Sequence, residues 1–400
     1  PLTQCSSDPH GEKAPLVLVN GTHTLLVSAY LEHRTGKREV SEDNRGKRVA
    51  YRCHLCCEGH NISTPLHISE GHASIHWDHF GFRYGTADIM CPIPPACETP
   101  SHVTVTSADP PLFLEVLNQE ERKDSFPHNF TLCMSTMFDF TNLLQLVQSM
   151  EMLQLLGVSR VVIYKTSCDA DTQRLLDYYT DKGFIEVIPW SMSNHLKVSK
   201  SWKPEIAPGD LHYYGQLPAL NDCVYRYMYQ SRYVAMHDVD ELILPQSVDS
   251  WNDLMPLLEQ KYGADKCYKF ENYMFPHTFK LPPPVSETHH RLRDKENPTW
   301  QGISGVNILK HLYHEPYTNL VRSNFKVIIN PRAVIETSVH GPLKLLYSCF
   351  FFFFSRPPMQ TGLTPDKLIF DGRVLGYSAR LIQAVNTVLR EAGLIQKDSI

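Results

Sequence analysis

From Phe130 onward the sequence alternates strand-like and helix-like segments, and this alternation restricts the fold more than any other feature. Short apolar runs typical of buried strands are separated by segments whose apolar residues recur every three or four positions. A β–α–β–α–β order predicts a mostly parallel sheet with crossover helices. The expected strands are 130–137, 161–164, 184–188 and 233–236, and the expected helices are 142–156, 171–182 and 215–229.

The last of these strands leads directly into a group of acids, Asp238, Asp240 and Glu241. Acids at the carboxyl end of such a strand lie where open α/β sheets bind their ligands. Two carboxylates there can hold a divalent cation that also binds phosphate oxygens. An Asp-x-Asp tripeptide alone is a weak signal, and a solvated pair of loop acids is the alternative interpretation. The strand before Asp238 and the helix before that strand favour the ligand site.

The region before residue 118 has a different pattern, with short strand-like runs at 24–31, 48–53 and 102–106 between turns. This spacing predicts a small β-rich domain. The polar stretch 118–128 marks the boundary to the α/β region. The expected organisation is a linker or stem at 1–14, a β-rich N-terminal domain at 15–118 and a catalytic domain at 127–400.

Cysteines and sequons indicate an oxidising compartment. The chain has 11 cysteines, and Cys5, Cys53, Cys56, Cys57, Cys91 and Cys97 gather in the N-terminal part. Such clustering in a loop-rich region predicts disulfides. A zinc site at residues 53–60 is the competing interpretation, although no second ligand pair with matching spacing follows. Glycosylation sequons occur at Asn20, Asn61 and Asn129.

Charge and composition exclude several classes of function. The net charge of −5 gives no electrostatic case for binding a nucleic acid polymer. No run of 18 or more apolar residues predicts a membrane span. The chain has neither a G-x-G-x-x-G motif nor a P-loop, which disfavours dinucleotide and ATP sites.

Two strings resemble a known family: GQLPALNDCVYR at 215–226 and YVAMHDVDE at 233–241 are similar to glycosyltransferase family 92, which includes animal β-1,4-galactosyltransferases. The resemblance implies an α/β fold of the GT-A, Rossmann-like type. It also implies inverting transfer of galactose from UDP-galactose to a glycan or glycoprotein acceptor such as an N-glycan, with Mn²⁺ as cofactor. The family resemblance further implies a single-pass type II membrane protein of the Golgi lumen, whose N-terminal anchor would lie outside this chain.

The family motif suggests the metal ligands. Asp240 matches the residue expected to coordinate Mn²⁺ directly, and Asp238 is expected to reach the donor's ribose or the metal through a water. Enzymes with this fold often supply a later histidine as a further ligand. His340, which follows the strand-like run 333–336, is the candidate for that role.

Three further residues are candidates for binding the donor nucleotide. Gln216 and Asp222 lie on the helix that precedes the acidic strand, where polar-face and capping roles are the alternative. Tyr164 ends the second expected strand and is a candidate for stacking on uracil, with a core position as the alternative.

The general base of an inverting transfer should follow the metal motif, because it removes the acceptor's hydroxyl proton. Asp294, Glu296 and Glu315 are the candidates, and each is equally compatible with plain surface charge. Trp300 in the same segment offers a ring that can stack on a sugar.

One stretch departs from the family pattern, namely the five consecutive phenylalanines at 350–354. A polar segment that closes over the donor is expected there. This departure keeps a second class of function open, a non-catalytic lectin-like or scaffold protein that retains the fold. A metal-dependent nucleotidyltransferase is the rival among enzymes, and the sequons and cysteines disfavour it.

Overall fold

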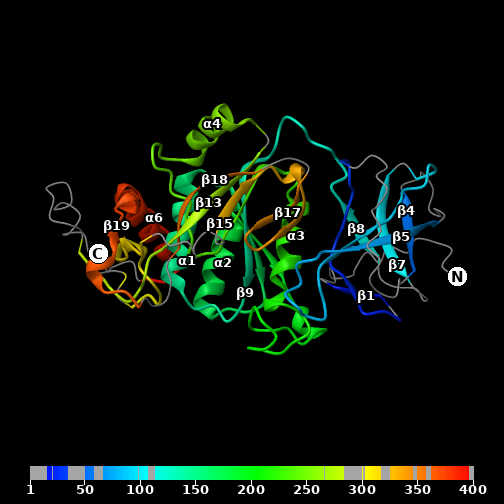
Figure 1. Ribbon diagram of the computed structural model, residues 1–400, viewed down its shortest axis with the longest axis horizontal. Coiled ribbons are helices and arrows are strands. Elements are labelled where there is room, and N and C mark those ends of the chain that lie inside the picture. Colours follow the sequence, from blue (N-terminus) through cyan, green and yellow to red (C-terminus); the bar gives the residue numbers. More distant parts are fainter. Residues whose placement is uncertain are drawn as a thin grey trace. The chain divides into compact units, whose positions relative to one another are not determined.

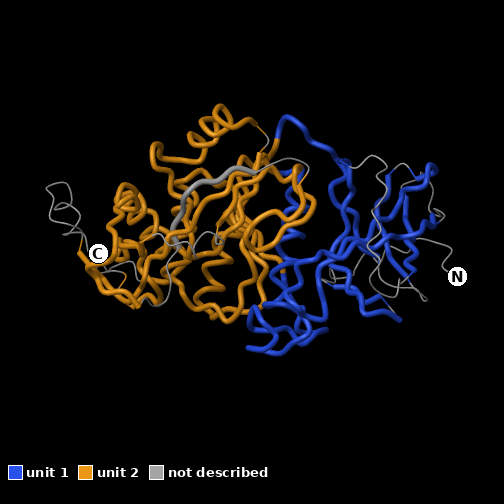
Figure 2. The backbone as a smooth tube through the Cα atoms, viewed as in Figure 1, with its two compact units in different colours: residues 1–125, 189–230 blue, residues 126–188, 231–400 orange. Residues whose placement is uncertain are grey.

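The computed structural model describes residues 16–19, 21–34, 50–57, 66–97, 99–106, 113–264, 266–282, 300, 302–316, 325–345, 349–356 and 362–395. The chain forms two compact units (Figure 2). Unit 1 comprises residues 1–125 and 189–230, and unit 2 comprises residues 126–188 and 231–400. The domain boundaries expected from the sequence, at 14, 118 and 127, stay a prediction.

Unit 1 is built on a six-stranded sheet with the order β3-β8-β7-β4-β5-β6. A separate pair, β1 and β2, is antiparallel. The buried core of the unit consists of alternate residues of β4 and β7, which is the pattern of strands with one face covered. The bounds are β1 Val17–Val19, β2 Thr24–Leu26, β3 Ala29–Tyr30, β4 Tyr51–Cys57, β5 His67–Ile75, β6 Ala87–Met90, β7 Pro100–Thr106 and β8 Leu114–Leu117.

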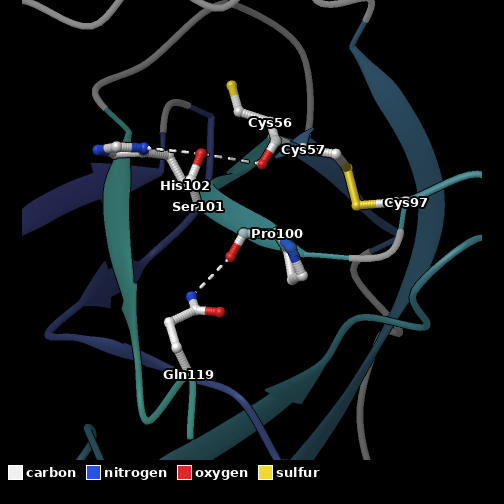
Figure 3. Close-up of a disulfide and its surroundings, with 7 residues drawn as sticks. All are labelled: Cys56, Cys57, Cys97, Pro100, Ser101, His102 and Gln119. Atoms are coloured by element: carbon white, nitrogen blue, oxygen red, sulfur yellow. Dashed lines mark hydrogen bonds between the residues drawn. A yellow bond between two sulfur atoms is a disulfide. The ribbon is translucent and has the colours of Figure 1, made fainter. Parts of the chain in front are cut away.

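Two disulfides join β4 to the segment that follows β6. Cys53 is bonded to Cys91 and Cys57 to Cys97. Figure 3 shows the second bond beside the start of β7, where Ser101 Oγ donates to the Cys56 carbonyl over 3.2 Å. These pairings confirm the predicted disulfides and exclude the zinc site at residues 53–60, because a bridged sulfur is no thiolate ligand.

Unit 2 contains a seven-stranded sheet with the order β11-β10-β9-β12-β15-β13-β18 (Figure 1). Its strands β9, β10, β11 and β12 confirm the four strands expected from apolar runs. The bounds are β9 His128–Met137, β10 Arg160–Lys165, β11 Ile185–Pro189, β12 Ser231–Met236, β13 Cys267–Met274, β15 Phe325–Ile329 and β18 Cys349–Arg356.

The sheet is mostly parallel, as the alternation predicts, and β15 is its antiparallel strand. Strand β9 pairs in parallel with β10 and with β12, as the alternating pattern predicts. Strand β15 then enters from the opposite end and pairs antiparallel with both β12 and β13. The phenylalanine run forms β18, which lies at the edge of the sheet and is parallel to β13.

Helix α1 (Leu143–Leu156) confirms the first expected helix, and Gly157 ends it at φ 97° in the left-handed region that glycine tolerates. Helix α2 (Ala170–Asp181) begins where the Asp169 side chain accepts a 2.7 Å hydrogen bond from the Thr172 amide. The remaining helices are α3 Gln216–Arg226 in unit 1, and α4 Trp251–Tyr262 and α6 Ser378–Glu391 in unit 2.

The core of unit 2 lies between the sheet and its helices. Most residues of α1 are buried, including Leu146, Val147 and Met150. Helix α6 packs against α1 through its apolar stripe, which includes Leu381 and Val385. Two small antiparallel pairs complete the unit: β14 Tyr313–His314 with β19 Ile369–Phe370, and β16 Val334–Ser338 with β17 Gly341–Leu345.

None of the helices in the described part of the chain is long and apolar enough to cross a bilayer.

Candidate functional site

The acids after β12 lie on a tight turn. The Asp238 carbonyl accepts a 3.2 Å hydrogen bond from the Glu241 amide, which closes a four-residue turn with Asp240 in its third position. On α1, Ser149 donates a hydrogen bond from its hydroxyl to the Val239 carbonyl. The turn is therefore held on two sides, by its own backbone and by a buried helix.

This turn brings three carboxylates together. One oxygen each of Asp238, Asp240 and Glu241 lie within 4.8 Å of one another. Glu241 is 2% exposed and its Oε2 accepts from the Asp238 amide over 2.9 Å, whereas the other two side chains are only partly covered. Carboxylate oxygens at such spacing can hold a hard divalent cation.

A buried lysine contacts two of the three carboxylates. Lys326 Nζ lies 2.9 Å from Asp238 Oδ2 and 2.7 Å from Glu241 Oε2. Burial by itself lowers the pKa of this ammonium, but the charges of Asp238 and Glu241 outweigh burial and raise the pKa above its ordinary value. Lys326 is therefore a permanent cation at the base of the cluster.

The sheet order explains how Lys326 reaches the acids. Met236, at the carboxyl end of β12, pairs with Val327 near the start of the antiparallel strand β15. Lys326 thereby stands at the same edge of the sheet as Asp238. From the other neighbour of β12, Ser135 on β9 donates to Asp238 Oδ1 over 2.8 Å. Both oxygens of Asp238 are thus oriented by residues of adjacent strands.

His237 packs below the turn. It is 3% exposed, its Nδ1 lies 3.0 Å from the Asp238 carbonyl oxygen, and its ring meets Trp251 edge-on. Burial lowers the pKa of His237 to about 4, so the ring is neutral at pH 7. The Trp251 indole donates to the Ile243 carbonyl over 2.8 Å, which fixes the chain just after the acids.

A pocket adjoins Asp240. Its volume is about 60 Å³, and its wall is mostly apolar. Two histidines and a second acid, Asp371, also line it. The lining residues are Asp240, Leu242, Leu244, Phe275, His277, Val306, Ile308, His311, Asp371 and Val374.

Two donor-binding candidates, Gln216 and Asp222, belong to unit 1 rather than to the unit that holds the acidic cluster. Asp222 is 6% exposed and accepts hydrogen bonds from Ser28 Oγ and, at 2.6 Å, from Tyr30 Oη. It also pairs with Arg226 Nε at 3.2 Å. This network is consistent with the structural role that the sequence left as the alternative, and nucleotide binding by Asp222 stays a prediction.

Tyr164 lies in β10 and is fully buried. A nucleobase can reach its ring only after the covering residues move. Uracil stacking on Tyr164 therefore stays a prediction, and it requires a local rearrangement of the core. Trp300 is also buried, and its indole donates to Asn386 Oδ1 over 2.8 Å, which places the ring in the core rather than on a sugar-binding surface.

His340 lies in the turn between β16 and β17, with its ring centroid 6.5 Å from that of Phe325. Within the described part of the chain it is not a member of the acidic group, so its role as a metal ligand stays a prediction.

Among the base candidates, Glu315 follows β14 and does not line the pocket beside Asp240. Asp294 and Glu296 lie outside the described residues.

Of the three sequon asparagines, Asn129 is exposed in β9, while Asn20 and Asn61 lie outside the described residues.

Sequence reasoning overlooked three residues that the structure brings to the site, Lys326, His277 and His311. Lys326 stands in a continuous apolar run, and this was a usable signal because a lysine buried in such a strand requires acidic partners.

Comparison with known proteins fits this geometry. The model of glycosyltransferase family 92 matches residues 128–352, more than half of the chain. The chain belongs to glycosyltransferase family 92. The match begins at the first residue of β9, includes the acidic turn and extends into the phenylalanine strand β18.

A family 92 glycosyltransferase of Caenorhabditis elegans is 22% identical to this family 92 chain over 237 residues. The aligned segment covers 59% of this chain and 41% of that relative. The relative is thus considerably longer than the region the two proteins share.

Proposed function

We propose that this chain transfers galactose from UDP-galactose to a glycan acceptor, with inversion at the anomeric carbon and with Mn²⁺ as cofactor. The observation that carries the proposal is the group of three carboxylates at the carboxyl end of β12, within the region that matches the family. Open α/β sheets bind ligands at this edge. A GT-A architecture, with the donor at the edge of the mixed sheet, is part of the same proposal.

The residues present fit a divalent metal. Oxygen-only ligands suit Mn²⁺ or Mg²⁺, and three carboxylate oxygens lie within 4.8 Å of one another. Asp240 would hold the metal together with Asp238. When bound, the metal neutralises charge on the diphosphate leaving group. His340 stays a candidate for an additional ligand.

The protein's own groups prepare this site. Ser135 and Lys326 orient the two oxygens of Asp238. Lys326 also holds Glu241, and the Ser149 hydroxyl fixes the turn from α1. Such preorganisation lowers the cost of rearranging charged groups when the substrate binds.

The proposed setting is the Golgi lumen, with the chain anchored as a single-pass type II membrane protein through a segment outside this sequence. The disulfides of unit 1 support passage through an oxidising compartment. The exposed sequon at Asn129 is compatible with that setting.

A non-catalytic lectin-like or scaffold role is the second candidate, because β18 carries the phenylalanine run where a polar closing segment was expected. Thermal unfolding with UDP, with and without Mn²⁺, separates the two. A ligand that binds only the folded state raises the melting temperature. A carbohydrate-binding scaffold predicts no shift with UDP.

The test of the proposal is turnover of UDP-galactose over a panel of N-glycan acceptors, with Mn²⁺ or with EDTA. We expect metal-dependent transfer, and we expect Asp240→Ala to lower kcat/KM by about 100-fold or more, because metal ions contribute several kcal/mol to catalysis. Lys344→Ala, an exposed change on β17, is the control and should retain activity. Full activity of Asp240→Ala would refute the metal site.

A further inference from the structure

The pocket beside Asp240 contains two histidines, each with one ring nitrogen that lacks a hydrogen-bond partner among the described residues. His277 follows β13, and His311 follows the short helical turn 308–310. Their ring centroids are 4.7 Å apart. Among the described residues, His277 Nε2 and His311 Nδ1 are buried and have no hydrogen-bond partner. A buried polar atom left unpaired costs about 1–3 kcal/mol, so a ligand that pairs with it gains affinity.

Burial keeps both imidazoles neutral. It lowers the pKa of His277, and it lowers that of His311 to about 4. A neutral imidazole has one donor and one acceptor nitrogen, which is the pairing capacity that a hydroxyl requires. The ring of His311 also hydrogen-bonds to the backbone of Pro276 and Phe279, which fixes its orientation.

The remaining wall suits one edge of a sugar ring. The volume of about 60 Å³ is several times the 10–15 Å³ that one water needs, so the pocket has room for a small part of a ligand. Apolar and aromatic side chains face the C–H groups of a ring, while a few polar groups fix its orientation. The apolar wall consists of Leu242, Leu244, Phe275, Val306, Ile308 and Val374.

A second, wider pocket borders the first at Asp371. Its volume is about 380 Å³, and it shares Asp371 with the narrow pocket. Burial alone would raise the pKa of Asp371, but hydrogen bonds from Arg373 lower it, so Asp371 stays charged. Arg373 Nε lies 2.9 Å and 2.8 Å from its two oxygens. Tyr273 and Phe370 provide aromatic rings in the same wall.

We propose that these two neighbouring pockets, which share Asp371, are the acceptor site: the terminal sugar places a hydroxyl-bearing edge against His277 and His311 beside Asp240, and the next sugar occupies the wider pocket at Asp371. This inference rests on the proposed glycosyl transfer. Among the described lining residues, Arg373 is the one lysine- or arginine-type cation and it is paired with Asp371, so the pockets suit a neutral oligosaccharide better than a diphosphate. Asp240 joins the narrow pocket to the acidic cluster, as transfer between the two sugars requires.

The test compares His277→Phe with wild type. Phenylalanine keeps the ring and removes the nitrogens, so the melting temperature should stay the same or rise. The KM for a lactosamine acceptor should increase roughly tenfold, because about one hydrogen bond is lost, and the KM for UDP-galactose should not change. His277→Gln, which restores a hydrogen-bonding group, should recover part of the affinity. His128→Phe, at the opposite end of the sheet, is the control.

Two results would overturn the acceptor site: an unchanged acceptor KM in His277→Phe, or a higher KM for UDP-galactose alone, which would assign the pocket to the donor's sugar. Saturation-transfer NMR without donor separates this inference from the proposed reaction. Methyl β-galactoside, methyl α-fucoside and lactosamine are the probes. Binding that His277→Phe abolishes supports the site even if no turnover occurs, whereas no binding of any probe refutes it.

Discussion

The two units each carry a buried acidic group, and the contacts around them differ. In unit 1, the Asp222 carboxylate is paired with Arg226 and accepts hydrogen bonds from two hydroxyl groups. In unit 2, Lys326 contacts Asp238 and Glu241, and Asp240 lies beside these two acids, so these four groups together carry net negative charge. A balanced pair holds a fold together, whereas an unbalanced group attracts a further cation. The comparison separates a structural acid from a candidate ligand site.

The largest expected effect is on the unbalanced cluster, from Lys326→Met. Removing the ammonium leaves two carboxylates facing each other, one of them buried, and should lower the free energy of unfolding by about 3–5 kcal/mol. Mn²⁺ should restore more stability in the variant than in wild type, because it supplies the missing charge. Urea denaturation with and without Mn²⁺ measures both effects.

The matched control for that variant is Lys344→Met, since Lys344 is exposed and its nitrogen lies 3.6 Å from Glu336. Its effect should be within about 1 kcal/mol. If Lys326→Met lowered the free energy of unfolding as little as this control, the charge of Lys326 would not be what stabilises the acidic cluster.

The next largest effect is a loss of folding stability at acid pH, which we expect in both units. Burial lowers the pKa of His237 in unit 2 and of His212 in unit 1 to about 4. The unfolded chain takes up these protons near pH 6.5, so stability present above that pH is lost as the pH falls towards 4. For His237 the loss is on the order of 3 kcal/mol. Unfolding free energies measured at pH 7 and pH 5 should differ in wild type and differ less in His237→Phe.

The smallest effect is expected in the balanced pair of unit 1. Asp222→Asn removes the charge that pairs with Arg226 and weakens the hydrogen bond from Tyr30. It should lower the free energy of unfolding by about 1.5–3 kcal/mol and leave the affinity for UDP unchanged. Denaturation and UDP titration of the same sample measure the two quantities. A loss of UDP affinity at normal stability would return Asp222 to the nucleotide site.

The sequence predicts those parts of the fold that depend on local pattern. Helix α1 was expected at 142–156 and spans Leu143–Leu156, because its apolar spacing and terminal glycine are both local signals. The acidic turn after β12 was likewise identified from a strand that ends in carboxylates. Helix α6 carries a comparable apolar spacing at Leu381, Val385 and Val388, so its pattern was available as well.

The rest depends on pairings between distant residues. Lys326 meets Asp238 across 88 positions of sequence, because β15 runs antiparallel beside β12. No local pattern reports that neighbour relation. The pocket has the same origin, since His277 and His311 are separated in sequence and become neighbours only through the loops that follow β13. The prediction that His340 is a metal ligand used only its position in the sequence, and it did not use any contact in the fold.

Calorimetric titration of UDP into wild type and Asp240→Asn, with Mn²⁺ or with EDTA, tests the central claim most directly. If the acidic cluster is a metal-dependent nucleotide site, UDP should bind to wild type in the presence of Mn²⁺. The affinity for UDP should be at least about tenfold lower with EDTA or in Asp240→Asn, because a metal–phosphate contact contributes more than one ordinary hydrogen bond. Equal affinity under all of these conditions would contradict it.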